Sequence, residues 1–437
     1  MIPAEWLQYA PQPEPLKPNQ KWNVFLSYRS VNRGWVLNLY DILTELKFKV
    51  FLDQYVLKPG DSLVRTLEDG LESSQGGILV WSNAARDSEW VRNEYDTLLS
   101  KATDDKQFHF IPIKIDRAPL PTFAKTKLFI DFTEYPDGPN GGDLLRLIHA
   151  LVGKSLSDEA VHFAWEQDEA SGIAAAQINA AIRNDRPQKL LQLYIERGLP
   201  WKTTAALSCK TAEGLSKLGY NDEAIDMLEK VELEFKKAIR PKQLKALALA
   251  RREKEGDLDK AQDILGELYE LNHLDPETLG IYGRTWMDRY AKSKDVKHLR
   301  QSRNYYAEAF EKAPDDYYTG INAATKSVFL GTPEDLEKAK GYAQRTQQIT
   351  GTEPCPGDYW KTATIGELLL IERKYKESGE MYQKAVEIAP SEKEHHKSTW
   401  KQAVRLMEKL QPAEPERMIV LAAFKELPDY DKLEMVV

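Results

Sequence analysis

The sequence predicts an α/β domain of the flavodoxin-like class, followed by a larger all-helical region. Between residues 22 and 153, short apolar runs suited to buried strands alternate with segments of helical spacing. Such alternation predicts a five-stranded parallel sheet with helices on both faces. Beyond residue 155 the strand signals disappear and helix follows helix. We therefore divide the chain into a leader (1–20), an α/β domain (21–155) and a helical region (156–437).

Composition limits the possible functions. The chain has 437 residues, 42% of them hydrophobic, and its net charge is −8, so no general basic surplus suggests nucleic acid as a partner. Cys209 and Cys355 lie far apart and the histidines are scattered, so we expect no metal site. There is neither a long apolar run nor a secretory signal pattern, so we expect a cytoplasmic protein without membrane contact.

The leader is rich in proline, which disfavours regular structure. We expect residues 1–20 to be disordered or to lie on the surface as an extended arm, with Trp6 and Leu7 available to dock it locally.

The elements of the α/β domain follow from the pattern of apolar residues. The predicted strands are 22–28, 48–53, 77–81, 108–116 and 128–132. The predicted helices are 34–46, 62–73, 141–153, and one that begins near Asp87 or Ser88, both good N-caps, and continues to Leu99.

The helix after the third strand contains the main candidate site residues. Val91, Tyr95 and Leu98 have the spacing of a buried face, whereas Trp90 and Glu94, four residues apart, share another face. This helix begins beyond the carboxyl end of a strand, where open α/β sheets bind ligands. From spacing alone, a packing tryptophan and a solvated surface glutamate remain the simpler interpretation.

Sequence motifs in this domain resemble a known family. FLSYRS at 25–30, FLDQYVLKPGDSL at 51–63, ILVWSNAARDSEWVRNE at 78–94 and FIPIKID at 110–116 are similar, in order and spacing, to the motifs of Toll/interleukin-receptor (TIR) domains. The resemblance implies a five-stranded parallel sheet. It also implies a self-association loop at 54–63, which includes Lys58, Pro59, Gly60 and Asp61.

TIR domains fall into two functional classes. Many are adaptors that only bind other TIR domains, whereas others cleave NAD+ at the nicotinamide–ribose bond. This chain resembles the cleaving class in its W-x-x-x-E pattern at Trp90 and Glu94. The resemblance implies that Glu94 is catalytic and that Trp90 packs against the substrate, with NAD+ as substrate and no cofactor.

Three further substrate-binding candidates follow from position. Tyr28 and Arg29 end the first predicted strand, where the family's S-Y-R motif meets the dinucleotide, although a surface ion pair is an equally good role for Arg29. The animal enzyme of the cleaving class has a second arginine where this chain has Ser30. Ser82 ends the third strand, where it either binds a substrate hydroxyl or caps a turn.

A single carboxylate is sufficient for this reaction in principle. Breaking the N-glycosidic bond develops positive charge on the ribose. A carboxylate can stabilise this charge or attack the ribose as a nucleophile. Nicotinamide leaves a cationic pyridinium as a neutral molecule, so no general acid is required.

The helical region contains degenerate repeats. Segments 215–231 and 250–268 align with Gly219 over Gly256 and Ala224 over Ala261, and further copies occupy 329–346 and 372–390. Small residues at such positions are typical of a tetratricopeptide (TPR) solenoid. Residues 276–325 also resemble the central regulatory region of apoptosis-signal-regulating kinases.

Together these features predict an assembly-dependent NAD+ glycohydrolase, with possible cyclase activity, in a bacterial defence or signalling effector. The expected partners are NAD+, further copies of the chain through TIR–TIR contacts, and an unidentified protein or peptide at the repeats. Two alternatives remain open: a non-enzymatic adaptor or scaffold, and a regulator that binds a nucleotide without turnover.

Overall fold

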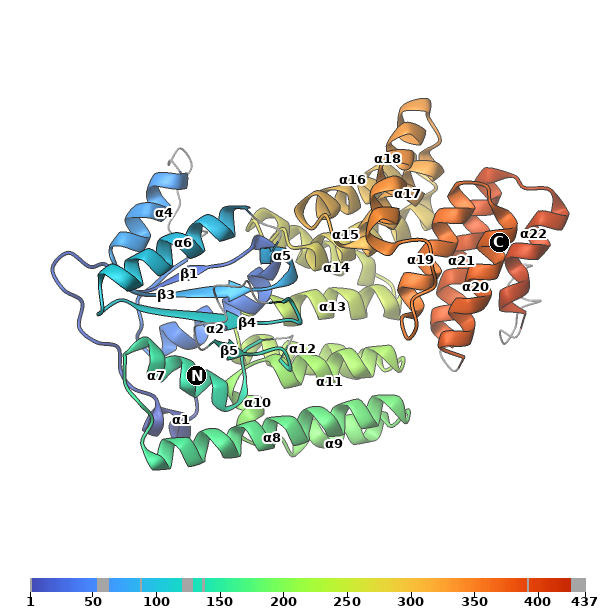
Figure 1. The fold of residues 1–437 in the computed structure, drawn as a ribbon. Helices are drawn as coiled ribbons and strands as arrows, with labels where there is room; N and C mark the ends of the chain where they lie inside the picture. Colours follow the sequence, from blue (N-terminus) through green and yellow to red (C-terminus); the bar gives the residue numbers. More distant parts are fainter. Residues whose placement is uncertain are drawn as a thin grey trace. The chain divides into compact units, whose positions relative to one another are not determined.

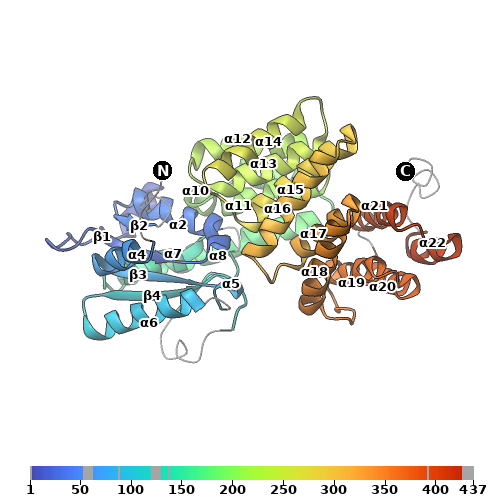
Figure 2. The same cartoon turned by 90° about the horizontal axis from the view of Figure 1, so that it is seen from above.

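The computed structural model describes residues 2–52, 63–86, 89–119, 129–135, 138–390 and 393–425. The chain divides into two compact units, Met1–Asp275 and Pro276–Val437. The first unit contains the sheet and the helices up to α14, and the second contains the remaining helices (Figures 1 and 2). The domain boundary predicted at residue 155 lies inside the first unit, between α7 and α8.

The sheet is five-stranded and entirely parallel, as the sequence predicts, and its strand order is β2-β1-β3-β4-β5. Its strands are β1 (Trp22–Ser27), β2 (Val50–Phe51), β3 (Ser74–Trp81), β4 (His109–Lys114) and β5 (Ile130–Asp131). The second and fifth strands are shorter than predicted. Nearly every residue of β1 and β3 is buried, which is why both strands contain an apolar run, Val24–Leu26 in β1 and Ile78–Trp81 in β3.

Helices cover both faces of the sheet (Figure 1). On one face, α2 (Arg33–Glu45) and α7 (Gly141–Leu151) pack on alternate strand residues such as Val24 and Val80. On the other, α4 (Leu63–Glu72) and α6 (Glu89–Asp104) cover the intervening residues, such as Phe25 and Leu79. This alternation follows from the two-residue period of a strand and produces the doubly wound fold.

The expectation of a disordered or extended leader is wrong for its first residues, whereas the suggested local docking through Trp6 is confirmed. Ala4–Tyr9 form helix α1, and Trp6, only 1% exposed, contacts the ring of Phe163 at a centroid distance of 5.7 Å. The Tyr9 carbonyl lies 2.9 Å from His149 Nε2 of α7. Burial of two aromatic side chains therefore docks α1 despite the neighbouring prolines, whereas Leu7 stays exposed.

The first unit continues as antiparallel helices. These are α8 (Asp158–Arg183), α9 (Pro187–Ile195), α10 (Leu199–Thr203), α11 (Ala206–Lys217), α12 (Asn221–Glu234), α13 (Ile239–Arg252) and α14 (Asp257–Glu270). Both views show α12, α13 and α14 side by side (Figures 1 and 2). Gly219 and Gly256 both have positive φ at helix junctions, and Ala224 and Ala261 are both fully buried, so the predicted repeat alignment is confirmed.

The helical repeats of the first unit pack directly on the TIR-like α/β region. Ile239 and Leu268 belong to the same apolar cluster as α2 and one face of the sheet. Nearby, Lys237 Nζ lies 3.9 Å from Asp41 Oδ1 of α2. Burial raises the pKa of Asp41 to about 7, Lys237 opposes that rise, and Glu45 adds to it.

The raised pKa predicts a pH-dependent stability. Because the folded pKa of Asp41 exceeds its ordinary value of 3.8, its contribution to the free energy of unfolding falls as pH rises toward about 7. Asp41→Asn removes the buried charge, so we expect the variant to be more stable than the wild type at about pH 8, with a smaller difference at about pH 4. Urea unfolding of the wild type and the variant at each pH measures this difference in the free energy of unfolding. Exposed Asp69→Asn is the control, and a difference that does not change with pH would contradict the assignment.

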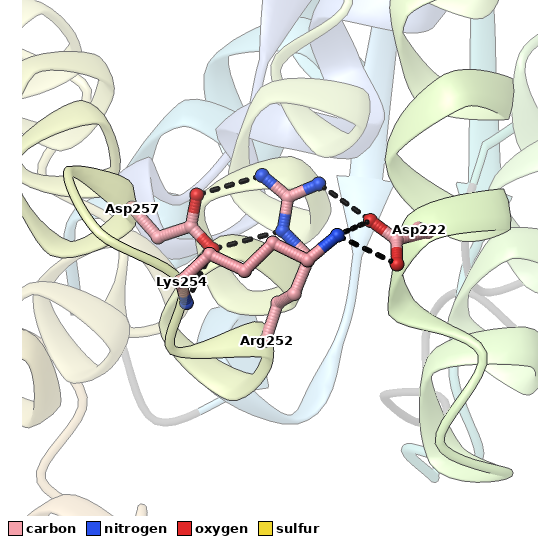
Figure 3. A network of polar contacts seen from close by, with 4 residues as sticks. All are labelled: Asp222, Arg252, Lys254 and Asp257. Atoms are coloured by element: carbon pink, nitrogen blue, oxygen red, sulfur yellow. Dashed lines mark hydrogen bonds and ion pairs between the residues drawn. The ribbon is translucent and has the colours of Figure 1, made fainter.

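A network of charged groups fixes the turn between α13 and α14 (Figure 3). Arg252 donates to both oxygens of Asp257, at 2.8 and 2.7 Å, and to Asp222 at 2.8 Å, and Lys254 Nζ also binds Asp222. Asp257 is 1% exposed and also accepts from the Lys254 amide at 2.9 Å. Because Arg252 donates to this carboxylate, the pKa of Asp257 is lowered.

Removing the Asp257 charge should destabilise the first unit. We expect Asp257→Asn to lower the free energy of unfolding by about 1–3 kcal/mol at neutral pH, since buried donors lose their acceptor. As pH falls through the lowered pKa of Asp257, the wild type loses this contribution and the difference should shrink. Chemical unfolding beside exposed Asp263→Asn tests this, and equal stability of the two variants would refute it.

The second unit consists of further helix pairs. They are α15 (Pro276–Ser293), α16 (Val296–Lys312), α17 (Tyr317–Leu330), α18 (Pro333–Thr350), α19 (Tyr359–Ile371), α20 (Tyr375–Ile388), α21 (Lys393–Leu410) and α22 (Glu414–Leu421). Small residues allow close helix contacts: a Cβ at Gly366 would lie 2.8 Å from the Tyr382 ring. Among the helices of the described residues, none is long and apolar enough to cross a membrane.

Candidate functional site

The candidate site lies at the carboxyl edge of the sheet, where β1 and β3 are neighbours. From β1 the chain continues through α2 to β2 on one side, and from β3 through α6 to β4 on the other. The connections therefore diverge between these two strands, which is the position where open α/β sheets bind ligands. Tyr28 and Arg29 directly follow β1, and Ser82 directly follows β3, as predicted.

Ser82 joins the two connections at this edge. Its hydroxyl is fully buried and donates to Asn32 Oδ1 at 2.8 Å, in the connection that follows β1. The same oxygen accepts from the Ala85 amide at 3.1 Å and so caps the short helix α5 (Asn83–Arg86). Of the two roles that the sequence left open for Ser82, this geometry matches the cap.

Asp116 organises the neighbouring connections. It follows β4, and its carboxylate accepts from the backbone amides of Asn83 and Ala118, each at 2.8 Å. Its carbonyl accepts from Thr133 Oγ1 at 3.2 Å, after β5. Asp116 thereby links the segments that follow three adjacent strands.

The roles of Asn32 and Asp116 were not predicted from the sequence. An aspartate directly after a buried strand was a usable signal for Asp116, because such residues bind the free amides of the next connection. Asn32 lies five residues after the end of β1 at Ser27, in a polar turn, and only the fold brings it to Ser82.

Tyr28 and Arg29 are both half-buried at the end of β1. The Tyr28 ring packs against the apolar cluster shared by α2 and the sheet. The structure therefore places both residues at the divergence of the connections, near the Asn32–Ser82 hydrogen bond.

Helix α6 places positions 90 and 94 close to the same edge. It begins at Glu89, beside the predicted start, so position 90 lies in its first turn and position 94 about 6 Å further along the axis. Leu98 is fully buried and lies against Gly77 of β3, where a Cβ would approach its Cδ2 to 2.4 Å. The predicted buried face is confirmed at Leu98. The side chains of Trp90 and Glu94, and the loop residues Lys58, Pro59, Gly60 and Asp61, lie outside what the structure describes.

The Ser82 hydroxyl should contribute to stability. Ser82→Ala removes both its hydrogen bond to Asn32 and the cap of α5, so we expect a loss of about 1–2 kcal/mol. Thermal unfolding beside Ser100→Ala, an exposed serine of α6, measures the difference. Unfolding of Ser82→Ala at the temperature of the control would contradict this role.

Comparison with known protein families identifies both parts of the chain. Residues 24–146 match the TIR domain family, and residues 220–327 match the family described as Tetratricopeptide Repeats-Sensor. The chain contains a TIR domain joined to tetratricopeptide-type sensor repeats. The resemblance of residues 276–325 to the apoptosis-signal-regulating kinases stays a prediction.

Several curated proteins are similar to part of this chain. The probable 2′ cyclic ADP-D-ribose synthase TcpB of Brucella melitensis is 29% identical over 126 residues, covering 25% of this chain and 50% of TcpB. The NAD(+) hydrolase PdTIR of Paracoccus denitrificans is 34% identical over 107 residues, covering 24% of this chain and 36% of PdTIR. The chain thus spans about half the length of TcpB and 36% of the length of PdTIR.

A solved structure resembles part of the chain more distantly. TTC0263, a tetratricopeptide-repeat protein of Thermus thermophilus, aligns with 47% of this chain and 98% of its own length, at 17% identity and a TM-score of 0.36.

Proposed function

We propose that this protein is an NAD+ glycohydrolase that cleaves the nicotinamide–ribose bond. The observation that supports this most is the W-x-x-x-E pattern of Trp90 and Glu94 in the first turns of α6, beside the divergence of β1 and β3 in a TIR domain. The names of TcpB, a probable 2′ cyclic ADP-D-ribose synthase, and of PdTIR, an NAD(+) hydrolase, support the same chemistry.

In this proposal Glu94 stabilises the positive charge that develops on the ribose as nicotinamide leaves. Trp90 packs against the ribose or nicotinamide and excludes water. Tyr28 and Arg29 bind the remainder of the dinucleotide, and an arginine suits its phosphates because the guanidinium forms paired hydrogen bonds. The chemistry needs no cofactor or metal. After nicotinamide has left, one water molecule captures the ribosyl cation and loses a proton to give ADP-ribose, or a ribose hydroxyl does so to give a cyclic isomer.

The repeats act in this proposal as a sensor that binds a protein or peptide and controls assembly. Activity requires contacts between TIR domains of several copies, made through the loop at 54–63, which includes Lys58, Pro59, Gly60 and Asp61. Such a protein would act in the cytoplasm, where NAD+ is available to it. Its role there would be that of a defence or signalling effector.

The proposed role of Glu94 predicts a loss of NAD+ cleavage when its charge is removed. We expect Glu94→Gln, which keeps the shape of the side chain, to lower nicotinamide release at least about 100-fold, because the charge that stabilises the transition state is removed. Asp104→Asn is the matched control: it makes the same change at an exposed position of α6, about 15 Å along the helix. Chromatography of NAD+ incubated with each protein measures the effect.

Protein concentration separates this proposal from the alternatives. We expect release per molecule to rise with concentration, since neighbouring copies complete the active assembly. Full activity of Glu94→Gln would refute the catalytic assignment. Absence of release from the wild type at every concentration, with NAD+ either unbound or bound intact, would instead favour an adaptor or a nucleotide-binding regulator.

A further inference from the structure

The last segment of the first unit contacts the start of the first TIR helix. Residues 271–275 follow α14 and end this unit. Arg33 is the first residue of α2, and its Nη1 donates to the Asn272 carbonyl. Arg33 is only 6% exposed and, among the described residues, forms no ion pair. A neutral backbone carbonyl, rather than a carboxylate, therefore sets the direction of this buried guanidinium.

The Asn272 carbonyl is itself held in a defined position. Asn272 has a left-handed backbone with φ of +63°, a conformation that Asn and Gly tolerate and β-branched residues do not. The His273 amide donates to the Leu268 carbonyl at 2.9 Å. Asp275, 4% exposed, accepts from Gln243 Nε2 at 2.9 Å. On the other side of the carbonyl, the Asn272 amide donates to the Tyr269 carbonyl at 2.9 Å, so the segment is fixed before and after the atom that binds Arg33.

The surroundings of this contact keep the neighbouring His273 uncharged. His273 is 7% exposed, and burial together with Arg33 and Lys242 lowers its pKa to about 4. His273 is therefore neutral near pH 7 and does not repel the Arg33 guanidinium.

One peptide bond connects Arg33 to the candidate site. Asn32, the residue before it, accepts the 2.8 Å hydrogen bond from Ser82 that joins the connections after β1 and β3. A shift of Arg33 moves the N-terminus of α2, and with it the side-chain oxygen of Asn32 that accepts from Ser82. The path from the repeats to the site is therefore short: the Asn272 carbonyl, Arg33, Asn32 and Ser82.

We propose that Arg33 is a positioning residue through which segment 271–275 of the repeats sets the geometry of the TIR site. The proposal rests on the proposed NAD+ cleavage and adds the route of its regulation. Segment 271–275 is followed directly by Pro276, the first residue of the second unit. In this proposal a displacement of one carbonyl in segment 271–275 is sufficient to change the site, without any contact with the substrate.

The test uses the full-length protein and two ways of disturbing the same contact. Arg33→Ala removes the donor, and Asn272→Val displaces the acceptor because valine does not tolerate the left-handed backbone. We expect each to lower kcat on the order of 10- to 100-fold with little change in KM, and the double variant to be no worse than the poorer single one. Arg33→Lys, which can still donate, and Asn272→Gly, which keeps the conformation, should both remain near wild type.

Lys237→Ala is the matched control. It disrupts another contact of the same interface, at Asp41 in a later turn of α2, and should leave kcat unchanged. Wild-type kcat in Arg33→Ala, increased activity, or equal losses in Lys237→Ala would overturn the proposal.

A second measurement separates this proposal from the NAD+ reaction itself. Hydrogen exchange of the peptide that contains the Ala85 amide, which Ser82 caps, reports the site geometry without substrate. Faster exchange in Arg33→Ala and Asn272→Val, but not in Lys237→Ala, supports positioning even if the wild type releases no nicotinamide. Unchanged exchange in both variants overturns positioning, whatever the outcome for NAD+ cleavage.

Discussion

Burial of the parallel sheet on both faces is the constraint on which the rest of the first unit depends. A parallel arrangement directs every strand's carboxyl end to one edge, and the helices on both faces leave that edge as the place where connections can form a site. The connections after β1 and β3 diverge there, and the Asn32–Ser82 hydrogen bond and the Asp116 carboxylate fix their paths. Position 94 is near this edge because α6 follows β3 and packs on it through Leu98.

The TIR domain packs directly on the helical repeats of the first unit. Its α2 face shares one apolar cluster with Ile239 and Leu268, and α7 approaches α8 so closely that a Cβ at Gly142 would lie 2.1 Å from the Ala164 carbonyl oxygen. A face covered in this way is unavailable for contacts with other copies, so the proposed assembly would have to use other surfaces of the domain. The same covering brings segment 271–275 to the start of α2, where the repeats can influence the site.

The fold was largely predictable from the sequence, and the details of the site were not. The apolar runs of the strands and the aligned pairs Gly219/Gly256 and Ala224/Ala261 are local signals, and the structure confirms the elements they predict. The prolines of the leader hid helix α1, and the partner of Trp6, Phe163, lies in a helix far along the chain. Contacts such as Ser82–Asn32 and Arg33–Asn272 join residues 50 and 239 positions apart, a separation at which no sequence periodicity indicates pairing.

The central claim is that NAD+ binds at the carboxyl edge between β1 and β3 and meets Glu94. Hydrogen exchange of full-length Glu94→Gln with and without NAD+ tests it most directly, because this variant should bind the substrate without consuming it. The account predicts that NAD+ protects the segments at 28–33 and 82–86 and the start of α6, and leaves α8 unchanged. Protection confined to the repeats, or none at saturating NAD+, would contradict it.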